Sequence, residues 1–323
     1  MIISSDTQYP WTNCTDGDCE ESQEVKEARA WELNLDQRDA MLKLAEQHGN
    51  VKGIIINGDL TSYGHPKELK KYKAIWNDVE LPIYEGLGNH DYLNNVNDTW
   101  LNQAANGMMD YMYKRTQSEI GVTPNWTVKS GFFSKTSEGS LAYSWDVGNV
   151  HFVQLQNFPT YEHSWSTFVW TSLTRKTYHI TNSLDWLEAD LKAASEAGKL
   201  IVLNYHDSDQ HWIEDHPETF GTTQARQIEL ANRFTELLAR YPVAAVFAGH
   251  YHRLTGPGYP DRLPGYIDVP VFYSGSTSQS KFLLVSFYES NVEVEAYQSF
   301  GGEPVSVPGG YWTLPVGTSP STD

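Results

Sequence analysis

The chain has 323 residues, of which 23 are Lys or Arg and 41 are Asp or Glu, so its formal net charge is −18. A protein that binds nucleic acid or an anionic membrane through charge needs a basic face, and no run of Lys or Arg supplies one. The composition is that of a packed globular protein, and no apolar stretch approaches the roughly 20 residues of a membrane helix. We therefore expect no nucleic acid as the main partner and no transmembrane segment. A small phosphate ester remains a candidate partner if bound cations supply positive charge.

Short apolar runs that end in polar clusters predict buried strands, and amphipathic stretches between them predict helices. The five strand candidates are residues 2–5, 51–57, 81–87, 200–205 and 243–248. The helix candidates, in which Leu, Ala and Trp recur at three- and four-residue steps, are residues 25–48, 66–78, 181–197 and 223–240. Apolar strands that alternate with helices are typical of an α/β fold with largely parallel strands.

Two further regions, residues 131–157 and 268–299, predict antiparallel β-structure. Residues 92–178 are rich in aromatic residues and Asn, and we interpret them as an insertion or cap at the strand ends. Residues 301–323 are rich in Gly, Pro, Ser and Thr, which predicts an irregular tail. Neither a repeat nor a linker divides the sequence, so we expect a single domain over residues 1–323.

The two cysteines, Cys14 and Cys19, lie in a short polar loop. A disulfide between them would indicate an oxidising compartment, whereas two free thiols would not. The acidic residues around them are compatible with a calcium-binding loop or with a plain solvated loop. The sequence starts at a predicted strand with no export signal before it, so we expect a processed protein that is secreted or periplasmic.

Side chains that can bind metal follow all five predicted strands. They are Asp6 with Gln8, Asp59, Asn89, His206, and His250 with His252. Taken singly, an Asp after a strand is usually a turn or capping residue, and a lone His is usually an ordinary polar group. Because ligands collect beyond the carboxyl ends of the strands in α/β sheets, five such ends in one ordered series indicate a shared metal site.

The motifs around these residues resemble those of the calcineurin-like metallophosphoesterases. The family pattern is Asp-x-His, Gly-Asp, Gly-Asn-His-Asp/Glu, a lone His and Gly-His-x-His. In the same order the chain has Asp6-Thr7-Gln8, Gly58-Asp59, Gly88-Asn89-His90-Asp91, His206 and Gly249-His250-Tyr251-His252. The resemblance spans residues 6–252 and implies a four-layer α/β/β/α sandwich with mixed sheets, carrying the aromatic-rich insertion.

The resemblance also implies two divalent metal ions bridged by Asp59. The other ligands would form a first ligand group of Asp6, Gln8 and His252 and a second ligand group of Asn89, His206 and His250. Oxygen and nitrogen donors of this kind suit Mn, Zn or Fe better than Ca or Mg. Gln8 departs from the family pattern, which has His there. Its amide either binds an ion directly or hydrogen-bonds a metal-bound water.

The implied mechanism is in-line attack on phosphorus by a hydroxide that bridges the two ions. His90 would not bind metal but would protonate the leaving oxygen or stabilise the transition state, a role that suits imidazole near neutral pH. Asp91 would either orient His90 or brace the turn, and the sequence leaves both roles open.

Two features favour a phosphodiesterase that acts on a small-molecule or lipid ester, with phospholipid or head-group diesters as candidates. Arg253 is the only basic residue beside a motif, whereas a doubly charged monoester usually needs a basic clamp. Aromatic residues near the motifs suit a ring, a choline-like cation or a lipid edge. They are Tyr9, Trp11, Tyr92, Tyr161, Trp165, Trp170, Trp212 and Tyr251. The alternatives are a phosphomonoesterase and a non-catalytic, metal-bound module that binds ligands.

Overall fold

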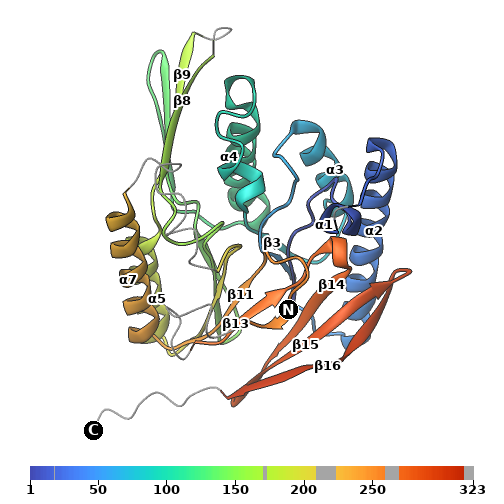
Figure 1. Ribbon diagram of the computed structural model, residues 1–323. Coiled ribbons are helices and arrows are strands. Elements are labelled where there is room, and N and C mark those ends of the chain that lie inside the picture. Colours follow the sequence, from blue (N-terminus) through green and yellow to red (C-terminus); the bar gives the residue numbers. More distant parts are fainter. Residues whose placement is uncertain (18, 170–172, 209–222, 259–268, 316–323) are drawn as a thin grey trace.

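Two six-stranded sheets form the centre of the protein, shown in Figure 1 as a computed structural model that describes residues 1–17, 19–169, 173–208, 223–258 and 269–315. The first sheet has the order β16 (Glu303–Pro315), β15 (Asn291–Phe300), β14 (Lys281–Phe287), β1 (Ile2–Ser4), β2 (Ile54–Ile56), β3 (Ile83–Glu85). The second has the order β12 (Thr255–Pro257), β13 (Val271–Ser274), β11 (Val243–Ala248), β10 (Leu200–Asn204), β7 (Val150–Gln154), β6 (Tyr143–Val147). Strands β1 to β3 are parallel, as are β7, β10, β11 and β13.

Helices cover the outer faces of both sheets, with α2 and α3 on one side and α5 and α7 on the other (Figure 1). The helices are α1 (Asn13–Asp16), α2 (Gln23–His48), α3 (Pro66–Trp76), α4 (Gln103–Arg115), α5 (Leu184–Glu196) and α7 (Gln224–Arg240), with short helices η1 (Asn89–Leu93), η2 (Trp100–Asn102), η3 (Thr116–Ile120) and η7 (Thr277–Gln279). On β1, Ile2 lies in an apolar cluster with Met41 of α2, whereas Ile3 lies in another with Phe247 of β11. Successive residues of β1 thus point in opposite directions, one toward the helices and the next toward the other sheet. The expected four-layer α/β/β/α sandwich is confirmed.

The predicted helices and parallel strands agree with the structure to within a few residues, because local signals mark their ends. Helix α2 begins after Ser22, whose hydroxyl accepts from the backbone N–H of Val25, and it ends at Gly49, where φ is 65°. Helix α3 has Pro66 in its first turn, and the side chain of Thr223 caps α7.

Three predictions about β-structure need correction. The irregular tail expected over residues 301–323 instead contains β16, an edge strand whose Trp312 packs against Phe272 with 5.9 Å between ring centroids. Proline is tolerated in β16 because the strand pairs on one side only. Residues 143–154, inside the expected insertion, form β6 and β7 of the second sheet. In the region 268–299, β14 and β15 are antiparallel as expected, and β13 is antiparallel to β12 but parallel to β11.

Much of the remaining insertion forms a separate four-stranded sheet, here called the arm. Its order is β4 (Trp126–Ser130), β5 (Ser134–Gly139), β9 (Thr174–Ile180), β8 (His163–Val169). Figure 1 shows the arm projecting away from the central sheets, near α4. The indole N–H of Trp165 donates to Oδ1 of Asn106 at 2.8 Å, and the hydroxyl of Tyr178 donates to Oδ1 of Asp110 at 3.3 Å. One face of the arm is therefore held against α4.

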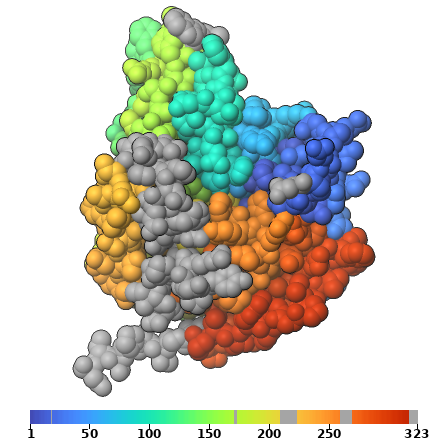
Figure 2. All heavy atoms as spheres, viewed as in Figure 1, coloured from blue at the N-terminus to red at the C-terminus, as the bar shows by residue number. Residues whose placement is uncertain are grey.

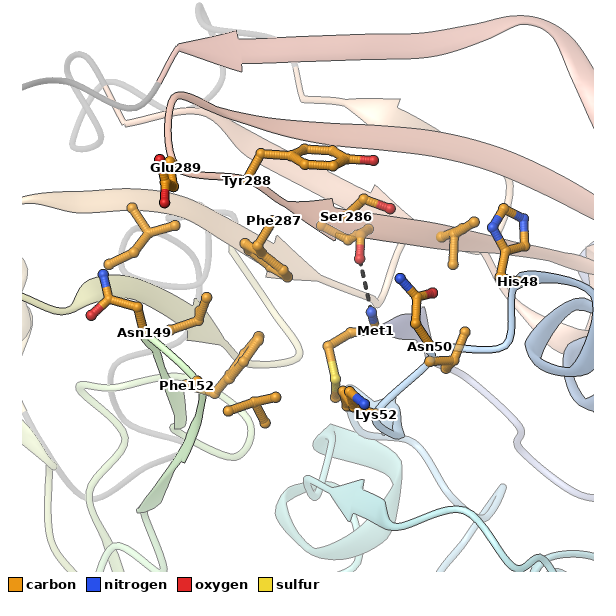
Figure 3. Close-up of a pocket in the computed structure, with 17 residues that line it drawn as sticks. Met1, His48, Asn50, Lys52, Asn149, Phe152, Ser286, Phe287, Tyr288 and Glu289 are labelled. Carbon is orange, nitrogen blue, oxygen red and sulfur yellow. Dashed lines mark hydrogen bonds between the residues drawn. The ribbon is translucent and has the colours of Figure 1, made fainter.

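A cavity of about 420 Å³ opens at the amino ends of the parallel strands (Figure 3). Met1, Lys52 and Phe152 are among its lining residues, and the terminal amine of Met1 donates to the carbonyl of Val285 at 2.8 Å. The cavity thus lies at the amino ends of these strands, whereas the predicted ligands follow their carboxyl ends. Among the helices that the structure describes, none has the length and apolar character needed to cross a membrane.

Candidate metal centre

The loops that follow five parallel strands carry the predicted ligands to one edge of the sheets. Strands β1, β2, β3, β10 and β11 are followed by Asp6, Asp59, Asn89, His206 and His250. Four site residues have a left-handed backbone, with φ of 52° at Asp6, 29° at Gln8, 51° at Asp59 and 70° at His250. Such conformations cost about 1 kcal/mol or more outside glycine, and they cluster at functional sites. The loops therefore accept backbone strain while aiming these side chains at one another.

Two motif glycines allow the loops to come this close. A Cβ on Gly88 would lie 2.2 Å from Oδ1 of Asp59, and a Cβ on Gly249 would lie 2.7 Å from Oδ2 of Asp6. Both distances are far below van der Waals contact, so any other residue would push the carboxylate away. The glycines of Gly-Asn-His-Asp and Gly-His-x-His are thus explained by close approach to the two carboxylates.

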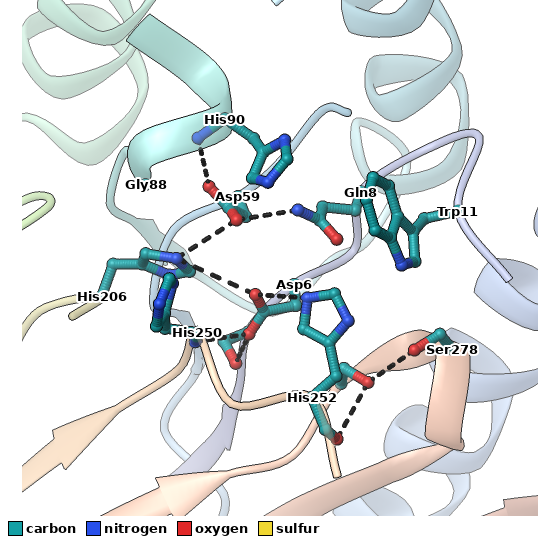
Figure 4. A network of polar contacts seen from close by, with 12 residues as sticks. Asp6, Gln8, Trp11, Asp59, Gly88, His90, His206, His250, His252 and Ser278 are labelled. Carbon is teal, nitrogen blue, oxygen red and sulfur yellow. Dashed lines mark hydrogen bonds and ion pairs between the residues drawn. The ribbon is translucent and has the colours of Figure 1, made fainter. Parts of the chain in front are cut away.

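Asp59 and Asp6 lie at the centre of the polar network in Figure 4. Oδ2 of Asp59 lies 3.2 Å from Nε2 of His206 and accepts a 2.8 Å hydrogen bond from Nε2 of Gln8. Oδ1 of Asp6 lies 3.2 Å from Nε2 of His252. Ligand atoms of Asp6, Asp59 and His206 all lie within 4.8 Å of one another. This spacing is close enough for one cation to contact all three.

Asn89 connects the remaining predicted ligands to this pair of carboxylates. Its Oδ1 lies 3.0 Å from Nε2 of His206 and 3.2 Å from Nδ1 of His250. The backbone N–H of His250 donates to Oδ2 of Asp6 at 3.0 Å. The structure therefore brings all seven predicted ligand residues into one cluster.

Charge and burial oppose each other inside the cluster. Burial raises the pKa of Asp59, but the neighbouring His206, His90 and His250 together outweigh burial and hold that pKa well below its usual range. Burial lowers the pKa of His206, and the carboxylates of Asp59 and Asp6 reverse this and raise it to about 10. Burial also lowers the pKa of His252, and the carboxylates of Asp6 and Asp16 reverse this and raise it to about 10. The carboxylates thus attract cations, and protons compete with metal ions for the imidazoles.

His90 lies beside the cluster and is held by backbone contacts. Its Nδ1 lies 2.8 Å from the carbonyl oxygen of Ser62, and because a carbonyl only accepts, Nδ1 carries the hydrogen. Its backbone N–H donates to Oδ1 of Asp59 at 2.8 Å. Nε2 is then the ring nitrogen that can exchange a proton with a substrate.

Asp91 is fully buried and braces two loops. Its Oδ1 accepts from the backbone N–H and the hydroxyl of Thr61, at 2.9 and 2.7 Å. Its Oδ2 accepts from the backbone N–H groups of Leu60 and Gly88, at 3.0 and 2.9 Å. Burial and the charge of Asp59 raise the pKa of Asp91 to about 7. These contacts correspond to bracing, one of the two roles that the sequence left open.

The side chains of the cluster fit divalent cations. Oε1 of Gln8 is buried and has no hydrogen-bond partner in the described part of the chain, so this oxygen is available to a cation or to a water molecule. Carboxylate oxygens, amide oxygens and imidazole nitrogens together are a donor set that Mn, Fe and Zn accept. The residues present therefore match the metal ions that the motif resemblance implied.

Asp16 contacts the first ligand group, and sequence reasoning missed it. Its Oδ1 lies 2.6 Å from Nδ1 of His252 and accepts from the indole N–H of Trp11 at 2.7 Å. Its Oδ2 accepts from the amide of Gln279 at 2.7 Å and from the hydroxyl of Ser278. A carboxylate on the far nitrogen of a ligand imidazole fixes the ring orientation and raises its basicity.

The loop that carries Asp16 is tied down on both sides. Cys14 and Cys19 form a disulfide, which is one of the alternatives that the sequence left open. The guanidinium of Arg253 donates to the backbone carbonyl of Asp16. The acidic residues near the cysteines were the available sequence signal. That signal did not identify Asp16, because its partner His252 is 236 positions away in the chain.

Two of the aromatic residues near the motifs contact site histidines. The ring centroid of Trp11 lies 5.3 Å from that of His90 and 5.7 Å from that of His252, edge to face. The ring of Tyr251 lies 5.2 Å from that of His250. Four others are buried in the interior, namely Tyr9, Tyr92, Tyr161 and Trp165. Trp170 and Trp212 lie outside the described residues.

The family model for the calcineurin-like phosphoesterases matches residues 2–254. The chain belongs to this family. Metal-dependent hydrolysis of phosphate esters is the activity of the family, and it agrees with a cluster of carboxylate, amide and imidazole ligands.

Comparison with solved structures agrees with this fold. The purple acid phosphatase PPD1 of yellow lupin is similar with a TM-score of 0.52 and 13% identity, over 97% of this chain and 53% of that chain. This chain thus spans about half the length of the lupin enzyme. Weaker similarity is found to a conserved uncharacterized protein of Streptococcus pneumoniae, described as a predicted phosphoesterase (TM-score 0.34, 12% identity, over 97% of this chain and 95% of that chain). Vacuolar protein sorting 29 of Cryptosporidium parvum has a TM-score of 0.36 and 10% identity, over 97% of this chain and 96% of that chain. No curated protein matches the sequence.

Proposed function

We propose that this chain hydrolyses phosphate diesters at a centre of two divalent cations. The observation that carries the proposal is the position of Asp59, whose Oδ2 contacts Gln8 of the first ligand group and His206 of the second. A carboxylate between two ligand groups is suited to bridge cations about 3.5–4 Å apart. Mn, Zn or Fe are the candidate ions, because the donors are mixed oxygen and nitrogen.

Each part of the chain has a role in this proposal. When bound, the cations would lower the pKa of an attacking water molecule and neutralise charge on the phosphate oxygens. Asp6 and Asp59 supply the buried negative charge that holds them. His90 would present Nε2 to the leaving oxygen and donate a proton there as the imidazolium, because its Nδ1–H is engaged by the carbonyl of Ser62. Asp91 positions His90 by bracing the loop that carries it.

The surrounding charge supports a diester as substrate. Arg253, the basic residue beside the last motif, donates to the backbone of Asp16 and is engaged by the disulfide loop. A diester carries one negative charge and needs less cationic support than a monoester. The substrate class that we propose is a small-molecule or lipid diester. The disulfide between Cys14 and Cys19 supports a secreted or periplasmic location.

Metal analysis followed by paired assays tests this function. After chelation, Mn²⁺, Zn²⁺, Fe²⁺, Ca²⁺ and Mg²⁺ are added back singly, and the hydrolysis of bis-p-nitrophenyl phosphate is compared with that of p-nitrophenyl phosphate. We expect about two ions per chain and a higher rate on the diester. A monoester rate well above the diester rate would indicate a phosphomonoesterase. Bound metal without turnover of either ester would indicate a non-catalytic binding module.

Replacing His90 with Ala tests its role as proton donor. We expect kcat to fall at least about a hundredfold, while the metal content stays at the wild-type value because the ring binds Ser62. The matched control is His48→Ala, an exposed histidine at the end of α2. Turnover of the His90→Ala protein near the wild-type rate would remove His90 from the mechanism.

A further inference from the structure

The end of the arm carries exposed apolar side chains. Phe132 and Phe133, in the turn between β4 and β5, are 94% and 59% exposed. Phe168 and Leu173, at the end of the neighbouring hairpin of β8 and β9, are exposed as well. Single exposed apolar residues are ordinary on protein surfaces, whereas several at one end of a projecting sheet form a patch that indicates an interaction.

Strand register places the starts of β5 and β9 at the same end of the arm. Strands β5 and β9 are parallel, and Ser134 pairs with Arg175, so the chain enters both strands from one end. The backbone N–H of Arg175 donates to the carbonyl of Phe133 at 2.9 Å. The rings of Phe132 and Phe133 meet edge to face with 4.8 Å between centroids. Together, Phe132, Phe133, Phe168 and Leu173 form one surface, here called the apolar tip.

The arm is basic in an otherwise acidic protein. Its segments 126–139 and 163–180 contain four basic residues and one acidic residue, a net charge of +3, against −18 for the whole chain. Asp110 of α4 lies 3.6 Å from Lys135 and 3.8 Å from Lys176 and neutralises part of this charge. Arg175, which pairs with Phe168 at the apolar tip, is exposed. Lys129 lies 3.9 Å from Glu138, and its side chain is 77% exposed.

We propose that the arm docks the protein on an anionic lipid surface, with the apolar tip among the head groups and with Arg175 and Lys129 facing the negative charge. Aromatic and aliphatic side chains gain free energy when they leave water for the interface. Basic residues next to them add an attraction that falls off within a Debye length. Exposed apolar side chains beside basic ones suit the anionic head groups and the acyl boundary of a lipid surface.

The arm also has a suitable position in the molecule. It forms one extremity of the space-filling view, beyond α4 and the central sheets (Figure 2). Its base lies near the metal centre, because Tyr161, which precedes β8, packs its ring 5.3 Å from that of Tyr92, next to Asp91. The seven residues of β9 rise about 23 Å, so docking at the apolar tip would hold the metal centre about one arm length from the lipid surface. Docking itself does not depend on the proposed function, since it needs neither metal nor turnover.

Sedimentation with lipid vesicles tests the docking. Wild-type protein in chelator is mixed with vesicles of phosphatidylcholine, with and without phosphatidylglycerol. We expect binding to the mixed vesicles and weaker binding to phosphatidylcholine alone. The double variant Phe132→Ser, Phe133→Ser should bind at least about tenfold more weakly. Arg175→Gln should bind the anionic vesicles about fivefold more weakly.

The matched control is Phe300→Ser, which removes a phenylalanine that is 79% exposed at the end of β15, away from the arm. It should bind like the wild type, and unchanged melting temperatures would show that all variants fold. Wild-type protein that stays in solution with both vesicle types would overturn the proposal, as would full binding by the double variant. A dimer that the double substitution abolishes, without vesicle binding, would instead assign the apolar tip to a second copy of the chain.

Discussion

The two predicted ligand groups of the candidate metal centre are supported by different parts of the fold. In the second group, His206 directs Nδ1 to the backbone carbonyl of Asn57, 2.8 Å away at the end of β2. In the first group, His252 directs Nδ1 to the side chain of Asp16, the last residue of α1, in the segment closed by the Cys14–Cys19 disulfide. A carbonyl at a strand end is present in any sequence that forms the sheet. The carboxylate of Asp16, in contrast, is lost when that one residue is substituted.

This difference coincides with the departure from the family pattern. Gln8, in the first ligand group, replaces an imidazole by an amide, which is a weaker donor for Zn or Mn. The charged partner on His252 acts in the opposite direction, because a carboxylate makes a ligand imidazole more basic than a carbonyl does. We therefore expect single side chains to control the metal affinity of the first ligand group more than that of the second.

Asp59→Asn should have the largest effect, because Asp59 contacts both groups. We expect affinity for both ions to fall by more than about a hundredfold, the upper figure for residues that only support a ligand, and turnover to be lost with them. Competition with a chromophoric chelator measures each binding step. Loss of one ion with normal binding of the other would contradict the bridging position of Asp59. Circular dichroism of the metal-free variant serves as the folding control.

Sequence alone predicted which side chains meet at the strand ends because the signals are local. Each ligand follows an apolar run, and parallel pairing brings the ends of such runs together. The role of Asp16 is not local. Only the folded chain brings it within 2.6 Å of Nδ1 of His252. In the sequence it resembles any other acid in a solvated loop.

The arm and the edge strand were predicted less well for related reasons. Strand β16 is rich in Gly and Pro, which form strands poorly, and it forms because β15 offers an edge and Trp312 has Phe272 to pack against. The sequence shows no basic run because the basic residues of the arm are divided between the segments 126–139 and 163–180. Pairing of β5 with β9 brings these segments side by side. Both features are products of long-range strand pairing.

Asp16→Asn tests the support of the first ligand group, with an intermediate effect. The substitution keeps the shape of the side chain but removes the charge that faces Nδ1 of His252. We expect the affinity of one ion to fall about 10- to 100-fold, the usual range for such partners, with the other ion unchanged. Asp78→Asn, an exposed aspartate after α3, is the matched control. An equal loss at both ions would mean that Asp16 supports the fold and not the first ligand group.

Gln8→His tests the side chain of the first ligand group that departs from the family pattern, and it should have the smallest effect. Nε2 of Gln8 lies 2.8 Å from Oδ2 of Asp59, so an imidazole at this position would reach the carboxylate at the centre of the cluster. Because imidazole binds Zn²⁺ more strongly than an amide does, we expect the affinity of the first ligand group for Zn²⁺ to rise by about tenfold. Combined with Asp16→Asn, the substitution should recover much of the lost affinity, since both act on one ion. If the affinity of the single variant stays unchanged, Gln8 is not a metal ligand but a partner of bound water. The two ligand groups would then differ in the number of their ligands as well as in the residues that support them.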